Sequence, residues 1–287
     1  MRRLILALIL AGAVATPLFA ASVDGLEIHF SEWRSLNSPS AGMAPTLIFV
    51  HGWTCDSSSW RGQAGPLSAE YRVVTLDLPG HGQSESPQDG KFSMDLFARA
   101  VEAVRAEVGA DRVVLVGHSM GVPVIRQYAT LYPQHVAGLV PVDGPISMAV
   151  FAAMLGAPSG ELPPFPTVGG PDGLQARENM IRGMFTAETP VALQDQILAM
   201  MLKAPEATAV GAMAAMADPG LWKDSPIPVP ILAVYAGTAQ VPDPAAITSF
   251  APGYEATQIA GTGHFLMMEK PDEFNRIVAE FLDEIEF

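Results

Sequence analysis

The chain of 287 residues has few charged side chains and almost no cysteine. Asp, Glu, Lys and Arg together make up 16% of it, and Cys55 is its single cysteine. One thiol can form neither an intramolecular disulfide nor a thiolate-rich zinc site, and the six histidines show no H-E-x-x-H spacing. We therefore expect no disulfide and no bound metal.

Positive charge is especially scarce. There are 16 Lys and Arg against 30 Asp and Glu, which gives a formal net charge of −14. An acidic surface repels phosphate backbones and anionic lipid headgroups, so nucleic acid is not an expected partner. Hydrophobic residues make up 49% of the chain, which is enough for one large domain or one domain with an insertion.

The first twenty residues have the pattern of an export signal. Arg2 and Arg3 precede an apolar stretch at 4–14, and residues 17–21 (PLFAA) are typical of a cleavage region. The stretch is shorter than the roughly 20 residues of a membrane-spanning helix. We interpret residues 1–20 as a signal peptide outside the fold, cut after Ala20 or Ala21, with an uncleaved anchor as the alternative. The chain would then be exported to the periplasm or the medium, without a stable membrane anchor.

Short apolar runs and helical segments alternate along the rest of the chain. Residues 26–30 alternate as an edge strand does, and the continuous runs that fit strands buried on both faces are 46–50, 72–76, 113–116, 139–142 and 231–235. Helical periodicity marks residues 94–108, 122–132 and 272–285. Strands that alternate with helices predict an α/β fold with a mostly parallel, doubly wound sheet.

Residues 146–225 interrupt this alternation. They contain no strand-like run and are rich in Ala, Met, Pro and Gly, with eight methionines that we single out: Met148, Met154, Met180, Met184, Met200, Met201, Met213 and Met216. We interpret the segment as a helical cap inserted after the sixth strand, which leaves 21–145 and 226–287 as the core. The methionines could line an adaptable apolar pocket, or they could simply fill the core.

A G-x-S-x-G motif follows the run at 113–116. The motif is Gly117-His118-Ser119-Met120-Gly121, and it lies between a predicted strand and a predicted helix. A sharp strand-to-helix turn of this kind strains the central serine and exposes its hydroxyl, and glycines are needed where side chains would meet neighbouring backbone. Ser119 is therefore a candidate nucleophile.

Two further motifs precede this one in the chain. His51, Gly52 and Trp53 follow the run at 46–50, and residues 77–84 (DLPGHGQS) follow the next run. In this order, the three motifs resemble the α/β-hydrolase superfamily, and the resemblance covers essentially all of the chain after the signal segment. It implies the α/β-hydrolase fold.

The resemblance also implies an oxyanion hole. The backbone N–H groups of Trp53 and Met120 would converge on the oxygen that becomes negative when Ser119 attacks a carbonyl. Such preorganised donors are commonly worth about 3 kcal/mol each. We interpret the remaining histidines of the motifs as structural, namely His51, His81 and His118.

A late loop supplies the candidate base. Residues 259–265 (IAGTGHF) place His264 before the last predicted helix, where the superfamily has its catalytic histidine. His264 would take the proton of the serine on attack and return it to the leaving group.

The resemblance also implies an acid that completes a catalytic triad with Ser119 and His264, and here the sequence departs from the superfamily pattern. Its usual place, shortly after the run at 231–235, holds Gln240, whose amide cannot stabilise an imidazolium by charge. Asp143, at the end of the run 139–142, is the preferred substitute, because some members of the superfamily carry their acid there. Asp243, further along the usual loop, is the alternative, and a site without a functional acid remains open. Asp143 could instead only cap the segment that follows.

These residues predict acyl transfer through an acyl-enzyme, without a cofactor. Serine rather than aspartate at the strand-to-helix turn argues against epoxide hydrolase and haloalkane dehalogenase chemistry. The apolar cap favours a carboxylic ester or lactone of an apolar small molecule as substrate. Amide, carbon–carbon or acyl-transfer chemistry uses the same scaffold, and a non-catalytic, ligand-binding relative of these enzymes is a further alternative. The sequence does not indicate an oligomeric state.

Overall fold

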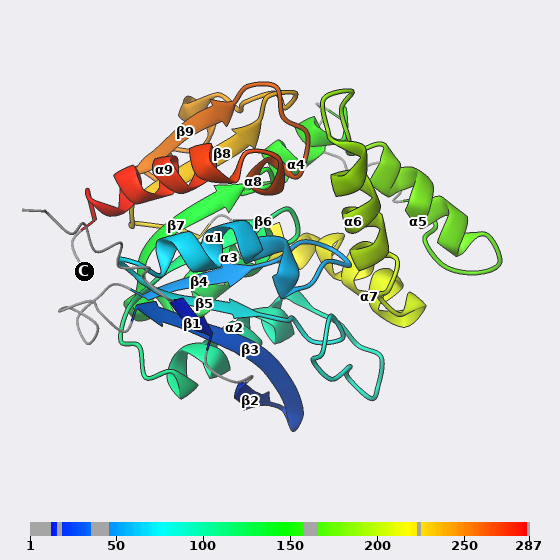
Figure 1. Cartoon of the computed structure of the whole chain (residues 1–287), viewed down its shortest axis with the longest axis horizontal. Coiled ribbons are helices and arrows are strands. Elements are labelled where there is room, and N and C mark those ends of the chain that lie inside the picture. Colours follow the sequence, from blue (N-terminus) through cyan, green and yellow to red (C-terminus); the bar gives the residue numbers. More distant parts are fainter. Residues whose placement is uncertain (1–12, 16–18, 36–45, 158–165, 223–224, 286–287) are drawn as a thin grey trace, which may run out of the picture.

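The computed structural model describes residues 13–15, 19–35, 46–157, 166–222 and 225–285. In this part of the chain a nine-stranded sheet lies between two layers of helices, and further helices cover one end of the sheet (Figure 1). The strands are β1 (Ala13–Ala15), β2 (Phe19–Val23), β3 (Leu26–Ser35), β4 (Thr46–Val50), β5 (Arg72–Leu76), β6 (Val113–His118), β7 (Val136–Val142), β8 (Ile231–Ala236) and β9 (Tyr254–Ile259).

The sheet is mostly parallel. Its order is β1-β3-β5-β4-β6-β7-β8-β9, with β2 paired to β3 beside this path. Neighbours from β5 to β9 are parallel, whereas β1, β2 and β5 each pair with β3 in the antiparallel sense. Every residue of β4, β6, β7 and β8 is buried, as expected of continuous apolar runs with helices on both faces. The predicted fold class is therefore confirmed.

Both ends of the sheet extend beyond the predicted strands. β9 was not among the predicted runs, because its sequence YEATQI is buried at its two ends and partly exposed between them. At the other end, β1 and the first two residues of β2 fall within 1–20, the range we expected outside the fold. β2 pairs with β3 from Phe19 opposite Phe30 to Val23 opposite Leu26. The sheet therefore includes residues before 21, where we expected the fold to begin, and the removal of a signal peptide stays a prediction.

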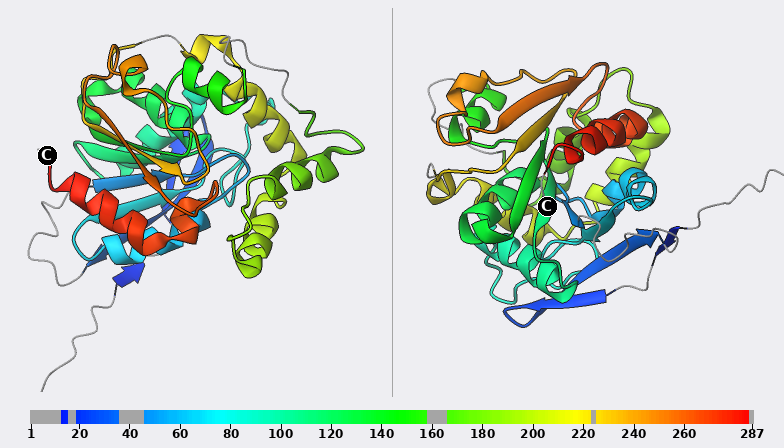
Figure 2. Two further views of the ribbon diagram at one scale, coloured as in Figure 1. Left: turned by 90° about the horizontal axis from the view of Figure 1, so that it is seen from above. Right: turned by 90° about the vertical axis from the view of Figure 1, so that its left-hand side faces the viewer.

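The helices form a layer on each face of the sheet (Figure 2). On one face, α1 (Arg61–Leu67), α8 (Leu266–Glu269) and α9 (Pro271–Leu282) pack against one another. On the other face, α2 (Met94–Glu107) packs against α3 (Gly121–Leu131), which lies along β6. Short 3₁₀ helices complete the core at η1 (Ser57–Trp60), η2 (Pro133–His135) and η4 (Pro244–Ala246).

Local sequence signals explain where the long helices begin. The Ser93 hydroxyl accepts a hydrogen bond from the Leu96 N–H at 3.1 Å, which caps α2 one residue before its predicted start. At α9, Pro271 occupies the first turn, where its missing N–H costs nothing, and Asp272 and Glu273 follow it near the positive end of the helix. The predicted ranges 94–108, 122–132 and 272–285 therefore lie within three residues of the observed bounds.

The cap consists of helices inserted between β7 and β8. They are α4 (Met148–Met154), α5 (Gly173–Arg182), α6 (Val191–Met201), α7 (Glu206–Met216) and η3 (Pro219–Trp222). The insertion follows β7, which contains the run 139–142 that we expected to precede it. No single helix of the described residues has the length and hydropathy of a membrane span, although α6 and α7, bent by 94°, pass together on length and composition.

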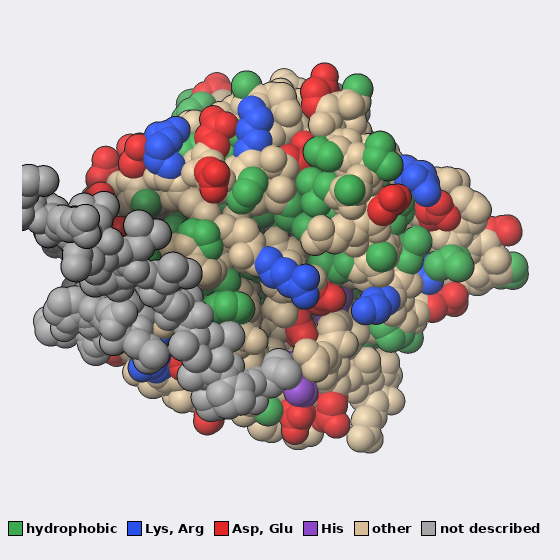
Figure 3. All heavy atoms as spheres, viewed as in Figure 1, with side chains coloured by type: hydrophobic (Ala, Val, Ile, Leu, Met, Phe, Trp, Pro, Cys, Tyr) green, Lys and Arg blue, Asp and Glu red, His purple; other side chains and the backbone are tan. Residues whose placement is uncertain are grey.

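Apolar side chains on the surface gather at the cap end of the molecule (Figure 3). Of the large hydrophobic residues exposed in the described part of the chain, all but Leu131 lie in the cap or in the loop after β8. These are Met154, Leu155, Leu174, Val191, Val210 and Val241. The apolar surface therefore concentrates near the carboxyl ends of the parallel strands, where α/β folds bind their ligands.

Candidate active site

Ser119 lies at a sharp turn between β6 and α3. Its φ is +53°, in the left-handed region that non-glycine residues rarely adopt. A Cβ on Gly117 would come within 2.4 Å of the Gly121 carbonyl oxygen, and one on Gly121 within 2.4 Å of the Val50 carbonyl oxygen. Only glycine fits at either position, so the motif has the steric basis that the sequence predicts. The Ser119 N–H donates to the Val142 carbonyl at 2.9 Å, which ties the turn to the end of β7.

Backbone strain is concentrated around this turn. Four non-glycine residues of the described chain have positive φ. Ser119 and Asp143 directly follow β6 and β7, and Thr54 lies four residues after β4. A Cβ on Gly144 would stand 2.5 Å from the Ser119 carbonyl oxygen, so the chain after β7 also packs directly on the turn. Strained conformations of this kind persist where the surrounding structure holds them, and they cluster at functional sites.

His264 and Asp143 form a close pair that lines the same cavity as Ser119. The His264 Nδ1 lies 2.6 Å from the Asp143 Oδ2, and the other carboxylate oxygen accepts the Ala236 N–H at 2.9 Å. The Asp143 N–H donates to the Val234 carbonyl at 2.9 Å, so backbone of β8 holds both ends of the residue. A carboxylate at Nδ1 favours the Nδ1–H tautomer and leaves Nε2 free to accept a proton.

The Asp143 carboxylate is charged although it is buried. Burial favours its neutral form, but the hydrogen bond and the charge of His264, with the Ala236 N–H, outweigh burial and lower the pKa of Asp143. The carboxylate is 7% exposed and the His264 side chain 17% exposed, so solvent screens their interaction only weakly. Asp143 can therefore stabilise a positive imidazolium.

The alternative acid, Asp243, has a different role in the structure. It is exposed, and its Oδ1 accepts the Ala245 N–H at 2.9 Å, which caps η4. Gln240, at the usual place of the acid, is exposed as well. The structure therefore brings Asp143, and not Asp243, to the imidazole. The capping role that we considered for Asp143 falls to Ser147 at α4, whose hydroxyl accepts the Val150 N–H at 3.2 Å.

The loop that carries His264 is held from three sides. The His264 N–H donates to the Met184 carbonyl of the cap at 3.2 Å, and the His264 carbonyl lies 2.9 Å from the Nε2 of His118. The Gly263 N–H donates to both carboxylate oxygens of Glu269, at 3.2 and 3.1 Å. Sequence reasoning missed both of these contacts, because a cap carbonyl and a carboxylate five residues after His264 leave no motif.

The three motif histidines are buried. The Nε2 of His51 accepts the Leu78 N–H at 3.0 Å, so its proton is on Nδ1, which lies 2.8 Å from the Gly52 carbonyl. Burial, reinforced by the neighbouring histidine, lowers the pKa of His81 and of His118 to about 3. Burial also lowers the pKa of His51. All three are neutral at neutral pH, which fits the structural role that we interpret for them.

Trp53 and Met120, the predicted oxyanion-hole residues, line the same cavity as Ser119 and His264. Trp53 follows β4, and Met120 immediately precedes α3. The Trp53 indole also donates to the Ala209 carbonyl of α7 at 2.8 Å. The residue that carries a predicted oxyanion donor thus binds the cap as well, a contact that the sequence does not indicate.

The cavity at this site, which we call the site cavity, measures about 870 Å³. Core residues line its floor, and the cap and the loop after β8 line its walls. No Lys or Arg is among its lining residues within the described chain. The exposed polar residues at its edge are Asn179, Thr238, Gln240 and Asp243, and the larger apolar ones include Phe151, Met154, Met180, Met184, Met213 and Met216.

Both interpretations of the cap methionines apply, since some line the site cavity and others fill the core. Met154, Met180, Met184, Met213 and Met216 line the site cavity, whereas Met200 and Met201 are buried in α6 away from it. Cys55 is buried too, and burial raises the pKa of its thiol well above the ordinary value, so it is a filler and not a nucleophile. No cluster of His, Cys, Asp and Glu in the described residues is placed to hold a metal ion.

The chain is similar in sequence to one family and to known proteins. Residues 45–158 match the family described as the alpha/beta hydrolase fold. The acetyltransferase component of the acetoin cleaving system of Cupriavidus necator is 37% identical over 123 residues, which are 43% of this chain and 31% of that protein. An uncharacterised protein of Mycobacterium bovis is 28% identical over 86% of this chain and 77% of its own length.

Solved structures resemble nearly the whole chain. A thermophilic esterase of Thermogutta terrifontis superposes with a TM-score of 0.74 at 23% identity, over 96% of this chain and 99% of that one. Other similar structures are those of an enol-lactonase and an epoxide hydrolase, so the likeness fixes the fold but not one reaction. The chain is therefore an α/β-hydrolase-fold protein.

Proposed function

We propose that this protein is an exported serine hydrolase that cleaves a carboxylic ester or lactone of a neutral, apolar small molecule. Ser119 is the nucleophile, His264 the general base and Asp143 the acid, with oxyanion donors from the backbone of Trp53 and Met120. The observation that carries the proposal is the 2.6 Å contact of His264 with Asp143 beside a strained Ser119, all three on one cavity.

The reaction follows from these positions. The Ser119 hydroxyl attacks the substrate carbonyl while Nε2 of His264 takes its proton, and the charge of Asp143 stabilises the imidazolium. The carbonyl oxygen becomes negative and accepts hydrogen bonds from the two backbone N–H groups. The C–O bond then breaks, and the alcohol leaves with the proton from His264. Water, deprotonated by the same imidazole, cleaves the acyl-serine and regenerates the hydroxyl.

The substrate class rests on the lining of the site cavity. Apolar side chains dominate the walls, and methionines can adjust to irregular shapes. With no Lys or Arg among the described lining residues and Asp243 at the edge, an anionic substrate would find no counter-charge. A neutral ester with an apolar chain or ring fits this environment best.

The test is hydrolysis of p-nitrophenyl hexanoate by the parent protein and by three variants. We expect Ser119→Ala to abolish turnover and Asp143→Asn to lower kcat roughly 10³- to 10⁴-fold, since the loss of the acid leaves the wrong tautomer and an unstabilised imidazolium. Asp243→Asn is the matched control, because its carboxylate caps η4 at the edge of the site cavity while His264 pairs with Asp143, and kcat for this neutral ester should stay within twofold of the parent.

Three other outcomes would contradict parts of this proposal. Equal loss in both aspartate variants would refute the assignment of Asp143. A parent that neither hydrolyses the ester nor reacts with a fluorophosphonate probe would refute the proposed hydrolase activity and favour a ligand-binding protein. A parent that reacts with the probe but cleaves only p-nitroanilides would replace ester by amide chemistry.

Export is tested separately. The proposal rests on the basic residues, the apolar stretch and the small residues within 1–21. Expression in a Gram-negative host should deliver protein to the periplasm with Ala21 or Ser22 as its N-terminus, measured by intact-mass spectrometry. Recovery of the uncleaved chain in the membrane fraction would favour the anchor instead.

A further inference from the structure

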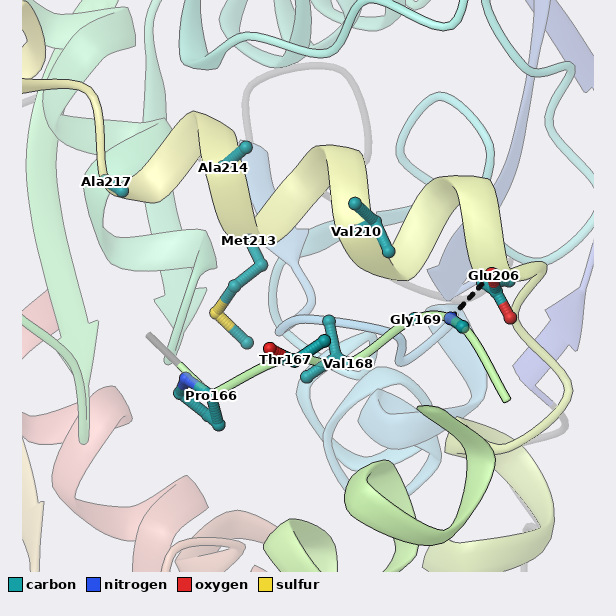
Figure 4. A pocket seen from close by; sticks show the side chains of 10 residues that line it. Pro166, Thr167, Val168, Gly169, Glu206, Val210, Met213, Ala214 and Ala217 are labelled. Carbon is teal, nitrogen blue, oxygen red and sulfur yellow. Dashed lines mark hydrogen bonds between the residues drawn. The ribbon is translucent and has the colours of Figure 1, made fainter. Parts of the chain in front are cut away.

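A second cavity adjoins the site cavity across the cap. It measures about 480 Å³ and lies between α7 and the segment 166–170 (Figure 4). Pro166 and Met213 line both cavities, so they form the wall between the two. Figure 4 shows the Met213 side chain extending from α7 toward Pro166 and Thr167. The second cavity has no contact with Ser119 or His264 and no role in the chemistry proposed above.

The position of Met213 on α7 explains why it belongs to both cavities. Glu206, Val210, Ala214 and Ala217 recur at helical spacing and face the second cavity. Met216, on the adjacent face, lines only the site cavity. Met213 lies three residues from both Val210 and Met216, at the border of the two faces, and it is 7% exposed.

α7 itself is held firmly against the core. The Ala209 carbonyl accepts the Trp53 indole N–H at 2.8 Å, and the Thr208 hydroxyl donates to the Gly80 carbonyl at 2.9 Å. A Cβ on Gly211 would stand 2.2 Å from the ring of Phe92, so helix and core are in close contact there. The helix backbone is therefore fixed, and the two cavities are separated by side chains. Of the two residues that line both cavities, Pro166 is rigid and Met213 is flexible.

The second cavity is a mostly apolar hollow that is partly open to solvent, since Val210 in its lining is 43% exposed. The side chains that line it are mostly apolar, from Pro166, Val168, Val210, Met213, Ala214 and Ala217. Its one charged residue, Glu206, accepts the Gly170 N–H at 3.1 Å, so the carboxylate is already engaged at the far end. No cationic side chain among the described residues lines it, and a neutral hydrocarbon is the ligand class that loses least on entry.

We propose that Met213 determines the chain length of the substrate by closing the site cavity against this second cavity. The inference rests on the proposed esterase function and adds a specificity-determining residue to it. Chains that fit the site cavity alone are cleaved well, and longer chains are excluded as long as Met213 keeps its length. A shorter side chain at 213 joins the cavities and provides further apolar space.

The test compares ester series of increasing length in Met213→Ala and in the parent. One series varies the acyl chain, from p-nitrophenyl butanoate to dodecanoate, and the other varies the alcohol, from butyl to dodecyl acetate. Each methylene moved into apolar surroundings is worth roughly a fourfold gain in affinity. We expect the ratio of kcat/KM for the C12 ester to that for the C6 ester to rise about tenfold or more in one of the two series.

Met216→Ala is the matched control. It removes the same side chain from the same helix, at a similar 8% exposure, but from a residue that lines only the site cavity. The C12 to C6 ratio should stay within threefold of the parent in this variant, and Met213→Leu should keep the parent profile. Thermal unfolding of all variants shows that each is folded before its ratio is compared.

Equal shifts in the two alanine variants, or an unchanged ratio in folded Met213→Ala in both series, would overturn the role of Met213. Either result would leave the proposed function intact, since the C6 esters would still be cleaved. A parent that cleaves no ester in either series would instead overturn the proposed function, and the specificity role would fall with it.

Discussion

Three buried neutral histidines should make this protein sensitive to mild acid. His51, His81 and His118 are each at most 1% exposed, and burial lowers the pKa of each, to about 3 for His81 and His118. In the unfolded chain a histidine has its ordinary pKa of roughly 6.5. Between these values the unfolded state binds a proton that the folded state does not, so stability falls as the pH falls.

The magnitude is large for so few residues. Each histidine whose pKa is lowered in this way contributes a slope of about 1.4 kcal/mol per pH unit below pH 6. His81 and His118 together would reduce the free energy of unfolding by about 4 kcal/mol between pH 7.5 and pH 5.0. That loss is a substantial part of the 5–15 kcal/mol, roughly, that holds a typical domain folded.

Urea unfolding at pH 7.5, 6.5, 5.5 and 5.0 measures the slope directly. His81→Gln removes one titrating ring while an amide can still donate to the Pro79 carbonyl, 3.0 Å from the present Nδ1. The variant should lose about 1.4 kcal/mol per pH unit of the slope. Val101→Ala is the control, because it removes buried methyl groups of α2 and should lower stability at every pH without changing the slope. A parent slope below about 1 kcal/mol per pH unit, or one unchanged in His81→Gln, would refute the reasoning.

Three further predictions concern the packing around the site. Gly144→Ala should abolish ester hydrolysis and lower the melting temperature, because its Cβ would lie 2.5 Å from the Ser119 carbonyl oxygen; a fully active variant would show that the turn can shift. Trp53→Phe should lower the free energy of unfolding by about 1 kcal/mol and speed hydrogen exchange in α7, because it removes the hydrogen bond to Ala209. Unchanged protection of α7 would mean that this bond does not hold the cap. Cys55 should not react with an aromatic disulfide reagent at pH 8 until urea unfolds the protein, and rapid labelling of native protein would contradict its burial.

The sequence predicts the core of the sheet well because its central strands are apolar on both faces. Runs such as 46–50 and 231–235 coincide with β4 and nearly all of β8, whereas β9 has exposed residues between its ends and leaves no apolar run. The same limit applies to the cap. Its helices were expected from composition, but which methionines face the cavity depends on how α5 and α7 sit on the core. Nothing in the local sequence encodes that placement.

The position of the acid shows what chain order can and cannot reveal. Sequence alone left Asp143 and Asp243 open, since each follows a strand whose carboxyl end meets the others at one edge of the sheet. The structure explains why the earlier strand can supply the carboxylate that contacts His264. β7 and β8 are parallel neighbours with Val142 opposite Val234, so a residue that follows β7 reaches the backbone at the end of β8.

Both the backbone and the side chain of Asp143 bind the neighbouring strand β8. Its N–H donates to Val234 and its carboxylate accepts the N–H of Ala236, so the side chain reaches the sheet edge where the usual acid would stand. Its φ of +43° directs the chain away toward the cap immediately afterwards. Asp143 thus follows β7 directly, precedes the insertion and contacts His264, and the loop after β8 is left free to shape the edge of the cavity. A substitution in that loop, at Thr238 or Gln240, should therefore change substrate preference without removing the acid.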